Sequence, residues 1–242
     1  PAEMMKLKIY RSATGDDLRE EVNCLKGANG VWKAELKGDR KGTFYTFQAK
    51  VNGRWLEEHP DPYAKAVGTN GKRGQIIDFR ETNPKGWGSD KAPLLKNPTD
   101  AVIYELHVRD LSISENSGIT QKGKFLGLTE SGTTNSHGQK TGIDHMAELG
   151  ITHVHLLPVF DYSSVDESRP DFPQFNWGYD PLNFNVPEGS YSTVPADGKV
   201  RISEFKKMVQ SLHSKGIRVV MDVVYNHTGP TQNSNFNQLV PG

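Results

Sequence analysis

The sequence predicts a mixed α/β protein that contains the opening strands of a (β/α)8 TIM barrel, preceded by part of a small antiparallel β-sandwich module. Three observations lead to this fold class. An almost unbroken apolar run extends from Ile217 to His227, and two similar runs occupy Ala101 to Val108 and Ile151 to Leu157. Amphipathic helix patterns separate the three runs. The first residues, up to about position 80, instead show short segments in which apolar and polar residues alternate.

The stretch from Ile217 to His227, IRVVMDVVYNH, has the pattern of a strand buried on both faces, as found in parallel sheets. Gly216 precedes it and Gly229-Pro230 follows it, so both ends carry turn signals. Asp222 lies in the middle of the run. Because desolvating an unpaired carboxylate is costly, we expect Asp222 to find a cation or several hydrogen-bond donors. A structural ion pair for Asp222, with His227 as a plain loop residue, is the alternative interpretation.

The order of the elements points to a parallel sheet. Helix patterns at Gly142 to Leu149 and at Ile202 to Lys215 connect the three apolar runs. The order β, α, β, α, β predicts parallel strands with right-handed crossovers. No strand is followed by the phosphate-binding glycine fingerprint of a nucleotide-binding sheet, which favours the barrel. Polar side chains follow each strand, where a barrel carries its site: they are His107, Arg109 and Asp110, then Asp161, then Asn226 and His227.

The length suggests three parts. A whole barrel takes roughly 250 residues, so residues 101–242 are expected to hold only its first three βα units and to stop in the loop after the third strand. Residues 83–100, which contain several prolines, are interpreted as a linker. Residues 1–82 form the β module, which has too few strands for a sandwich of about seven, so we expect its first strands to be missing. Its candidate strands are Met5–Tyr10, Val31–Leu36, Thr43–Val51 and Gln75–Phe79.

Charge and cysteine content exclude several classes of protein. The 29 basic and 29 acidic residues cancel, which argues against nucleic acid or an anionic membrane as the main partner. Cys24 is the only cysteine, so an internal disulfide and a multi-cysteine metal site are excluded. No apolar run reaches the roughly 18 residues of a membrane span. The N-terminus lacks an apolar signal-peptide region, which leaves the compartment open between cytoplasmic and secreted.

The connection after the second strand, Pro158 to Lys199, has about 40 residues, whereas such connections usually have about 2 to 6. It contains FNWGYDP, Phe175 to Pro181, in which aromatic rings alternate with Asn and Asp. This mixture suits a sugar, whose apolar face stacks on a ring while amides and carboxylates bind its hydroxyls. The competing interpretation, that the aromatics plug the barrel end as a small core, is favoured for Trp177. Tyr179, next to a glycine, can face a ligand.

Several motifs resemble those of one enzyme family. FNWGYDP resembles the YNWGYDP signature of type I pullulanases, and DVVYNH followed by Thr228 resembles the first conserved region of the alpha-amylase superfamily, glycoside hydrolase family 13. YELHVRDLS, at Tyr104 to Ser112, and LTESGT, at Leu128 to Thr133, are similar to the corresponding parts of the same debranching enzymes. Phe175 departs from the signature, which has Tyr there, and this removes one hydroxyl.

The resemblance implies roles for individual residues. Tyr179 would stack against the sugar in the subsite where the bond is cut, and Asp180 would hold the local hydrogen-bond network. His227 would hydrogen-bond the side of the sugar that carries its primary hydroxyl, and Asp222 would pair with an Arg on the next strand. The remaining candidates are Trp177 for sugar binding, Asn176 for support, Asn226 as a weak calcium ligand, and Trp32 and Trp55 as sugar platforms or sandwich core. One Asn falls far short of the 6 to 8 oxygens that calcium takes, so no metal is expected.

The resemblance also implies the reaction, which is retaining hydrolysis of α-1,6-glucosidic bonds by a nucleophile and an acid/base carboxylate, without a cofactor. In the family these two residues follow the fourth and fifth strands, so we expect no catalytic residue in this chain and no activity from it alone. The expected partners are a branched α-glucan (pullulan, glycogen, amylopectin or a limit dextrin) and a second polypeptide, or the rest of a parent protein, that completes the barrel. An isoamylase, a branching enzyme and a non-catalytic carbohydrate-binding protein are the alternatives.

Overall fold

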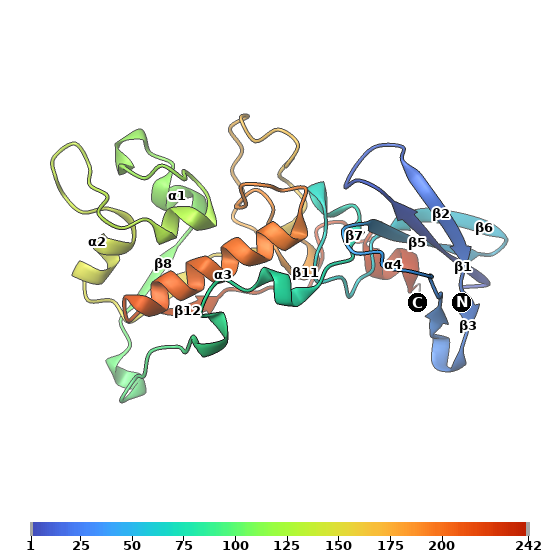
Figure 1. Cartoon of the computed structure of the whole chain (residues 1–242), viewed down its shortest axis with the longest axis horizontal. Coiled ribbons are helices and arrows are strands. Elements are labelled where there is room, and N and C mark those ends of the chain that lie inside the picture. The colour runs from blue at the N-terminus through green and yellow to red at the C-terminus, as the bar shows by residue number, and fades with distance from the viewer. Residues whose placement is uncertain (1, 241–242) are drawn as a thin grey trace.

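The computed structural model describes residues 2–240, which form two main sheets at opposite ends of the long axis of the molecule (Figure 1). The strands are β1 (Met4–Tyr10), β2 (Leu18–Asn23), β3 (Leu25–Lys26), β4 (Trp32–Lys33), β5 (Phe44–Val51), β6 (Arg54–His59), β7 (Gly74–Gln75), β8 (Ile103–Leu106), β9 (His153–Leu156), β10 (Phe160–Tyr162), β11 (Pro181–Pro187) and β12 (Arg218–Met221). The α-helices are α1 (Val108–Ser112), α2 (Gly142–Glu148), α3 (Gly198–Ser214) and α4 (Asn235–Leu239). One main sheet is parallel and the other antiparallel.

The parallel sheet is formed by the three predicted apolar runs, in the order β8-β9-β12. Ile103 of β8 and Arg218 of β12 both oppose His153 of β9, and the two ladders continue in register to Leu106 and Met221, which both oppose Leu156. The order of the strands in the sheet therefore follows their order along the chain, as consecutive βα units require.

Helix α3 covers one face of the parallel sheet and begins four residues before the start that the apolar pattern predicted. Its first turn contains Gly198 and Lys199, which do not contribute to that pattern. The Asp197 side chain accepts a hydrogen bond from the Lys199 backbone N–H and so caps the helix. A polar cap satisfies a backbone donor that would otherwise be unpaired. The capping residue therefore sets the helix boundary, and the apolar stripe does not.

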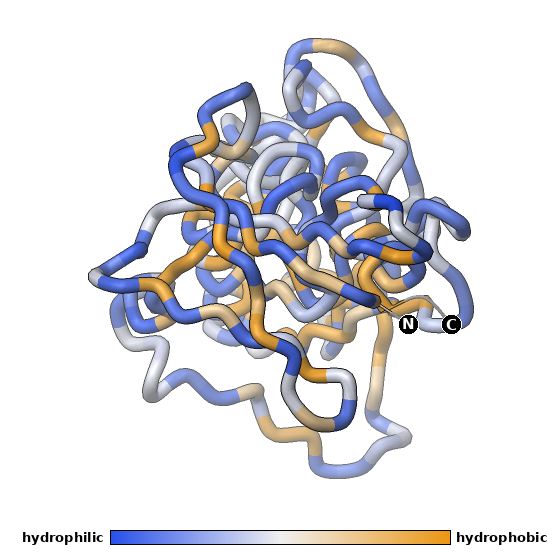
Figure 2. Tube along the Cα trace, turned by 90° about the vertical axis from the view of Figure 1, so that its right-hand side faces the viewer, coloured by the Kyte–Doolittle hydropathy of each residue, from blue (hydrophilic) through white to orange (hydrophobic). Residues whose placement is uncertain are grey.

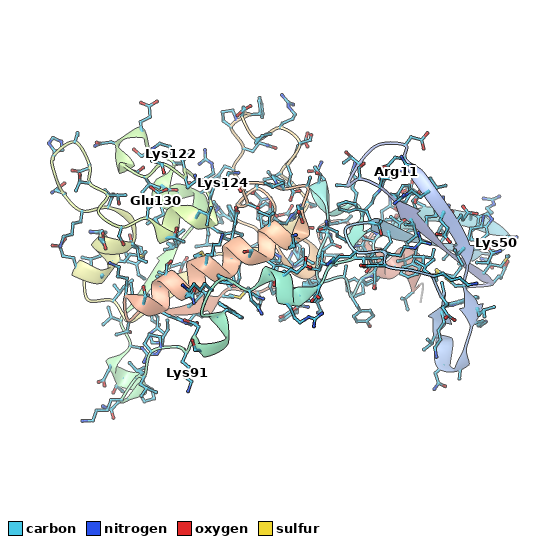
Figure 3. The ribbon with its side chains drawn as sticks, viewed as in Figure 1. Arg11, Lys50, Lys91, Lys122, Lys124 and Glu130 are labelled. Atoms are coloured by element: carbon cyan, nitrogen blue, oxygen red, sulfur yellow. The ribbon has the colours of Figure 1, made fainter. Side chains whose placement is uncertain are left out.

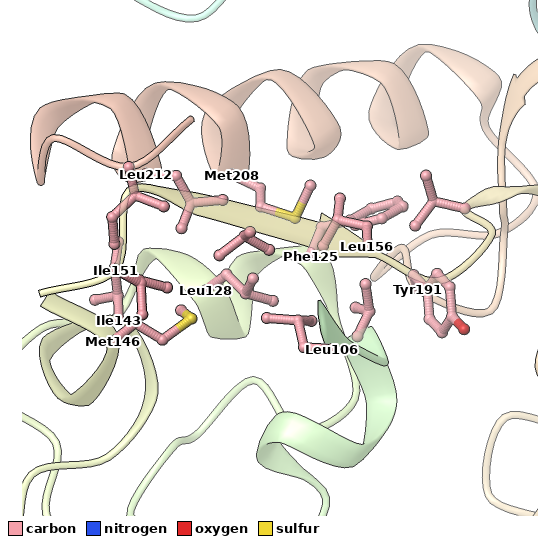
Figure 4. Packing of buried hydrophobic residues seen from close by; sticks show 14 of the residues in the cluster. Leu106, Phe125, Leu128, Ile143, Met146, Ile151, Leu156, Tyr191, Met208 and Leu212 are labelled. Atoms are coloured by element: carbon pink, nitrogen blue, oxygen red, sulfur yellow. The ribbon is translucent and has the colours of Figure 1, made fainter. Parts of the chain in front are cut away.

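The main core lies between α3 and the parallel sheet. Met208 and Leu212, four residues apart on the predicted apolar face of α3, are fully buried. Figure 4 shows them above Leu156 of β9 and above Phe125 and Leu128, which come from the segment between α1 and α2. Burying a side chain of this size contributes about 1.5–3 kcal/mol, so this cluster holds the helix onto the sheet.

The third parallel strand is much shorter than the sequence predicted. β12 ends at Met221, so Asp222 lies just beyond the strand and not in its middle. The Asp222 backbone N–H donates to the Leu156 carbonyl at 3.0 Å, and irregular backbone follows. In the described part of the chain β12 is also not buried on both faces, because its side chains are only half-buried and Val220 is 41% exposed.

The antiparallel sheet has the order β2-β1-β5-β6, with β7 also paired to β5. β1 and β5 match predicted strands, whereas the sequence did not predict β2 or β6. The segment Val31–Leu36 forms only the two-residue β4, and Gln75–Phe79 contributes only its first residue to β7. Figure 2 shows apolar and polar positions mixed along the strands at this end of the molecule. No helix in residues 2–240 is long and apolar enough to span a membrane.

One cluster of apolar side chains packs against the antiparallel sheet. Trp32 is half-buried against it, as expected for a core residue, and Leu239 of α4 belongs to it. Trp55 is half-buried, with the Lys6 ammonium 4.5 Å from its ring centre. A cation over a ring occupies the face that a sugar would use, which favours a packing role for Trp55.

Candidate functional site

The long loop between β9 and α3 folds back to meet the residues that follow β12. Its segment Phe175–Pro181, called the loop segment below, is fixed at one end by the β10–β11 ladder, in which Tyr162 opposes Pro181. The Pro181 carbonyl also accepts a hydrogen bond of 2.9 Å from the Gly229 backbone N–H. Two motifs more than 40 residues apart in the sequence therefore lie side by side.

Asp222 and His227 both contact Tyr179 where the two motifs meet. The Tyr179 hydroxyl donates to Asp222 Oδ2 at 2.6 Å, and His227 Nε2 lies 2.8 Å from the Tyr179 carbonyl oxygen, to which it donates. The other ring nitrogen of His227 lies 3.0 Å from the Asn226 side chain. Asn226 thus supports His227.

The Tyr179 ring is held at one end and open at the other. Its hydrogen bond to Asp222, and to a smaller extent burial, raises the pKa of Tyr179 to about 12, so the phenol keeps its proton at neutral pH. The residue is 37% exposed. Asp222 was expected to need a cation, and the nitrogen-bearing side chain that lies within 4.0 Å of it in residues 2–240 is His155, through its Nε2. Asp222 is half-buried and accepts a hydrogen bond from the Tyr179 hydroxyl.

Asp180 forms the network that closes the loop segment. Its Oδ1 accepts from Asn176 Nδ2 at 2.8 Å, and its Oδ2 accepts from the Ser163 hydroxyl at 2.8 Å and from the Ser164 hydroxyl. The Asn176 side-chain oxygen accepts from the Gly178 backbone N–H at 2.8 Å. Gly178 has φ +88, and a Cβ there would lie 2.7 Å from the Pro158 carbonyl oxygen, so the turn requires glycine.

Trp177 does not plug a core in this structure. It is 61% exposed, and Phe175 is 53% exposed. The turn at Gly178 places Trp177 outward while Tyr179 points to Asp222. The side chains of Trp177 and Phe175 therefore lie at the surface of the described part of the chain.

His107 anchors the loop segment, a role that sequence reasoning missed. It is 8% exposed, and its Nε2 lies 2.8 Å from the Asn176 carbonyl oxygen, to which it donates. Its Nδ1 accepts from the Asp110 backbone N–H at 3.4 Å. Its ring packs against Phe175, with centroids 5.1 Å apart, and against Tyr191. The sequence placed His107 among the polar residues after the first strand. It did not predict the contact with Asn176, which lies 69 residues further along the chain.

Replacing His107 by Phe should lower kcat/KM of the complete protein by about tenfold, because the ring packing survives while the donor to the Asn176 carbonyl is lost. His107→Gln places an amide N–H near the same position and should recover most of that loss. The exposed His137 supplies a matched control, and His137→Phe should leave kcat/KM unchanged. Equal losses in His107→Phe and His107→Gln, at equal thermal stability, would show that the hydrogen bond does not position the loop segment.

Asp161 was grouped with the polar residues of the site, and that interpretation is wrong. It is fully buried and accepts from Arg201 Nη1 at 2.9 Å, while Arg201 Nη2 donates to Glu167 at 2.6 Å. Glu188 lies in the same cluster and accepts backbone N–H groups at 2.8 and 3.1 Å. The three carboxylates could hold a metal ion, but the fully buried Arg201 guanidinium already binds two of them. We therefore interpret this buried acid cluster as a structural ion pair with extra carboxylates.

The buried acid cluster should make the free energy of unfolding fall as the pH rises from about 4.5 to about 7. Burial raises the pKa of Glu167 from 4.5 to about 7, against the opposing effect of Arg201. At pH values below 4.5 Glu167 is protonated in both the folded and the unfolded chain, and its stabilising effect is fully present. This effect is lost as the pH rises through about 7, the pKa of Glu167 in the folded chain. A shift of this size corresponds to about 3 kcal/mol.

Urea unfolding at a series of pH values measures this dependence. Glu167→Gln keeps an oxygen for Arg201 and the Asn70 backbone N–H, and should flatten the curve between those pH values. The exposed Glu57 is the matched control, and Glu57→Gln should leave the curve unchanged. A Glu167→Gln curve parallel to that of the unmodified protein would contradict the assignment.

A model described as "Alpha amylase, catalytic domain" matches residues 78–240. The chain belongs to the alpha-amylase family. The matched range includes the loop segment and the residues from Ile217 to His227, so both motifs of the site lie in the catalytic-domain region. The match implies the mixed α/β TIM-barrel fold that the sequence predicted.

Within the alpha-amylase family, the chain is similar to pullulanases and to an isoamylase. The chain is 45% identical over 213 residues to a pullulanase of Bacillus subtilis (strain 168), across 88% of this chain and 29% of that protein. It is 33% identical over 224 residues to isoamylase 3, chloroplastic, of Oryza sativa subsp. japonica, across 82% of this chain and 27% of that protein. The predicted resemblance to pullulanases is confirmed, and an isoamylase is also a relative.

The structure is similar to those of solved pullulanases. The match to the pullulanase from Paenibacillus barengoltzii in complex with maltohexaose and alpha-cyclodextrin has a TM-score of 0.96 at 53% identity, and covers 100% of this chain and 37% of that one. For the pullulanase from Bacillus acidopullulyticus the TM-score is 0.92 at 47% identity, with 99% and 29% covered. This member of the alpha-amylase family therefore spans about a third of the length of the relatives that it matches.

Proposed function

We propose that the protein is a debranching enzyme that hydrolyses α-1,6-glucosidic bonds in branched α-glucans with retention of configuration, and that this chain supplies part of its sugar subsite. One observation carries the proposal: at the end of the parallel strands the exposed Tyr179 is held through its hydroxyl by Asp222 and through its backbone carbonyl by His227. Pullulan, glycogen, amylopectin and limit dextrins are the substrates of this class that fit. The pullulanase relatives support the reaction class.

In this proposal each site residue has a separate role in binding the sugar. The Tyr179 ring stacks on the sugar, and its bond to Asp222 fixes the ring orientation before the sugar arrives, which lowers the ordering cost of binding. Trp177 offers a second ring, and His227 binds the side of the sugar that carries the primary hydroxyl. Asn176 and Asp180 hold the turn that presents these groups.

The strands β8, β9 and β12 are, in this proposal, the first three of the eight barrel strands. Residues 83–100 then form the linker, and residues 1–82 form a partial starch-binding-like module. The nucleophile and the acid/base carboxylate lie outside this chain, after the fourth and fifth strands. In a similar solved structure this region belongs to one chain that is nearly three times as long. We therefore propose that a continuation of the same polypeptide, and not a second polypeptide, supplies the two carboxylates.

Two assays test the proposal. The complete protein should release oligosaccharides from pullulan and should spare amylose, which has no α-1,6 bonds. The 242-residue chain by itself should release no maltotriose from pullulan, because it lacks the two carboxylates. Cleavage of amylose by the complete protein, or maltotriose release by the isolated chain, would contradict the proposal.

An isoamylase is the second candidate, because isoamylase 3 of Oryza sativa is 33% identical over 82% of this chain. It shares the debranching reaction class, so the pullulan assay is again the discriminating one. A complete protein that debranches amylopectin and leaves pullulan intact would favour the isoamylase.

A further inference from the structure

Three Asn-Gly pairs occur in the sequence, beginning at Asn29, Asn52 and Asn70. Asn-Gly is the pair in which an asparagine most readily loses its side-chain amide, because glycine has no side chain to hinder attack by its own backbone nitrogen. All three asparagines lie in turns with positive φ, at 55°, 50° and 56°. Since the three pairs have the same local sequence and similar backbone, their surroundings decide which of them reacts.

The reaction closes a succinimide ring. The glycine backbone nitrogen attacks the side-chain carbonyl carbon of the asparagine, the bond from that carbon to the side-chain nitrogen breaks, and this nitrogen leaves as ammonia with the proton of the glycine N–H. Water then opens the succinimide at either carbonyl and gives aspartate or isoaspartate, without an oxidant or a cofactor. With ψ at 32° for Asn29 and 25° for Asn70, the glycine nitrogen turns away from the side-chain carbon. The turn must therefore open before the ring can close.

The turn at Asn70 is held through its side-chain amide. Asn70 Nδ2 donates to Asp166 Oδ1 at 3.0 Å, and Asn70 Oδ1 accepts from the Glu167 backbone N–H at 2.7 Å. Gly71 is buried, and its carbonyl accepts from Asn183 Nδ2 at 3.0 Å. Opening this turn breaks several buried or half-buried hydrogen bonds together, so we expect Asn70 to be protected.

The turn at Asn52 is exposed but firmly closed. Figure 3 shows Lys50, two residues before Asn52, at the outer end of the antiparallel sheet. Asn52 and Gly53 form the two-residue connection between β5 and β6, whose ladder continues up to the turn. Asn-Gly with positive φ at both residues suits such a hairpin. The Gly53 backbone N–H, which is the attacking group, also donates to both carboxylate oxygens of Glu3 at 3.2 Å.

The turn at Asn29 is the least restrained of the three. It joins β3 and β4, which have two residues each and form a small sheet of their own. Asn29 and Gly30 are exposed, and within residues 2–240 the Asn29 side chain makes no hydrogen bond. The Gly27 N–H donates to the Val31 carbonyl at 2.7 Å, and the Val31 N–H donates to the Ala28 carbonyl at 3.2 Å. A separate two-stranded hairpin is marginally stable, so this turn opens more often than the other two.

We propose that Asn29 is the principal site of spontaneous deamidation in the folded protein. Conversion adds a negative charge to the turn, and isoaspartate also inserts an additional carbon atom into the main chain there. Trp32 opposes Lys26 in the short β3–β4 ladder, so its ring lies close to the altered turn. Figure 1 shows β3 at the end of the molecule opposite the parallel sheet.

Peptide mapping by mass spectrometry tests the proposal on the complete protein after incubation at mildly alkaline pH. Asn29 should deamidate at least about tenfold faster than Asn52 or Asn70, because the rate follows the population of the open turn. In concentrated urea the three turns are lost, and the three rates should become similar. Asn29→Gln should remove most of the conversion, since a longer side chain closes its ring more slowly, whereas Asn52→Gln, the matched control, should leave it unchanged.

Two results would overturn the proposal. One is conversion in the folded protein that is equal at the three pairs, or fastest at Asn52 or Asn70. The other is an advantage of Asn29 that persists in urea, which would assign the selection to the neighbouring sequence instead of the fold. Both readouts are masses of peptides from the unmodified protein, so the test does not depend on the folding of any variant or on the proposed function.

Discussion

Replacing Tyr179 by Ala should lower kcat/KM of the complete protein on pullulan on the order of 100-fold. The substitution removes the ring that stacks on the sugar and also leaves Asp222 without the hydroxyl that now donates to it at 2.6 Å. Loss of a buried aromatic anchor typically costs about 2 kcal/mol or more, and each 1.36 kcal/mol corresponds to about tenfold in rate. Steady-state kinetics on pullulan, with thermal unfolding measured in parallel, gives the value.

Two variants separate the contributions of the Tyr179 ring and hydroxyl. Tyr179→Phe keeps the ring and loses only the bond to Asp222, so its loss should be smaller than that of Tyr179→Ala. Tyr63, a 76% exposed tyrosine of the β module, provides the control, and Tyr63→Ala should leave kcat/KM unchanged. A Tyr179→Ala protein with full kcat/KM would remove Tyr179 from the site.

Replacing Arg201 by Met should lower the free energy of unfolding by about 3–5 kcal/mol, the cost of leaving buried charges unpaired. Arg201 is fully buried and binds Asp161 and Glu167. Its guanidinium also donates to the carbonyls of Gly68 and Pro195, at 2.8 Å each, and so ties the connector before β7 to the base of α3. Chemical denaturation at neutral pH measures the loss.

A control variant and a rescue variant test whether the loss in Arg201→Met comes from unpaired buried charges. Arg80 pairs with Asp78, but its side chain is 89% exposed, so Arg80→Met should leave the free energy of unfolding nearly unchanged. Adding Asp161→Asn and Glu167→Gln to Arg201→Met removes the stranded charges and should restore part of the stability. If Arg201→Met is as stable as the unmodified protein, the cluster is not held by its ion pairs.

The sequence predicted the elements whose side chains repeat with a clear period. The three apolar runs became parallel strands, and the spacing of Met208 and Leu212 located the buried face of α3. The two motifs of the candidate site were also recognised by their residue types. Tyr179 and Asp222 could be placed together because the ends of parallel strands and the loops that follow them share one edge of a sheet.

What the sequence did not predict depends on contacts distant in the chain. β2, LREEVN, and β6, RWLEEH, are charged strands at the edges of the antiparallel sheet. They form strands because they pair with β1 and β5, and not because apolar and polar residues alternate in them. Asp161 and Arg201 are 40 residues apart with no motif to connect them. The position of His107 after a strand indicated a polar end, but not that its ring would hold a distant turn.

Because the turn at Gly178 directs Trp177 outward, Trp177 can serve as an intrinsic fluorescence probe. Trp177 is 61% exposed beside Tyr179, whereas the other three indoles, at Trp32, Trp55 and Trp87, are half-buried. Water-facing indoles emit at longer wavelengths than shielded ones, so a ligand that covers Trp177 would shift the emission to the blue and leave the other three largely unaffected. Intrinsic fluorescence can therefore follow occupancy of this surface without any label.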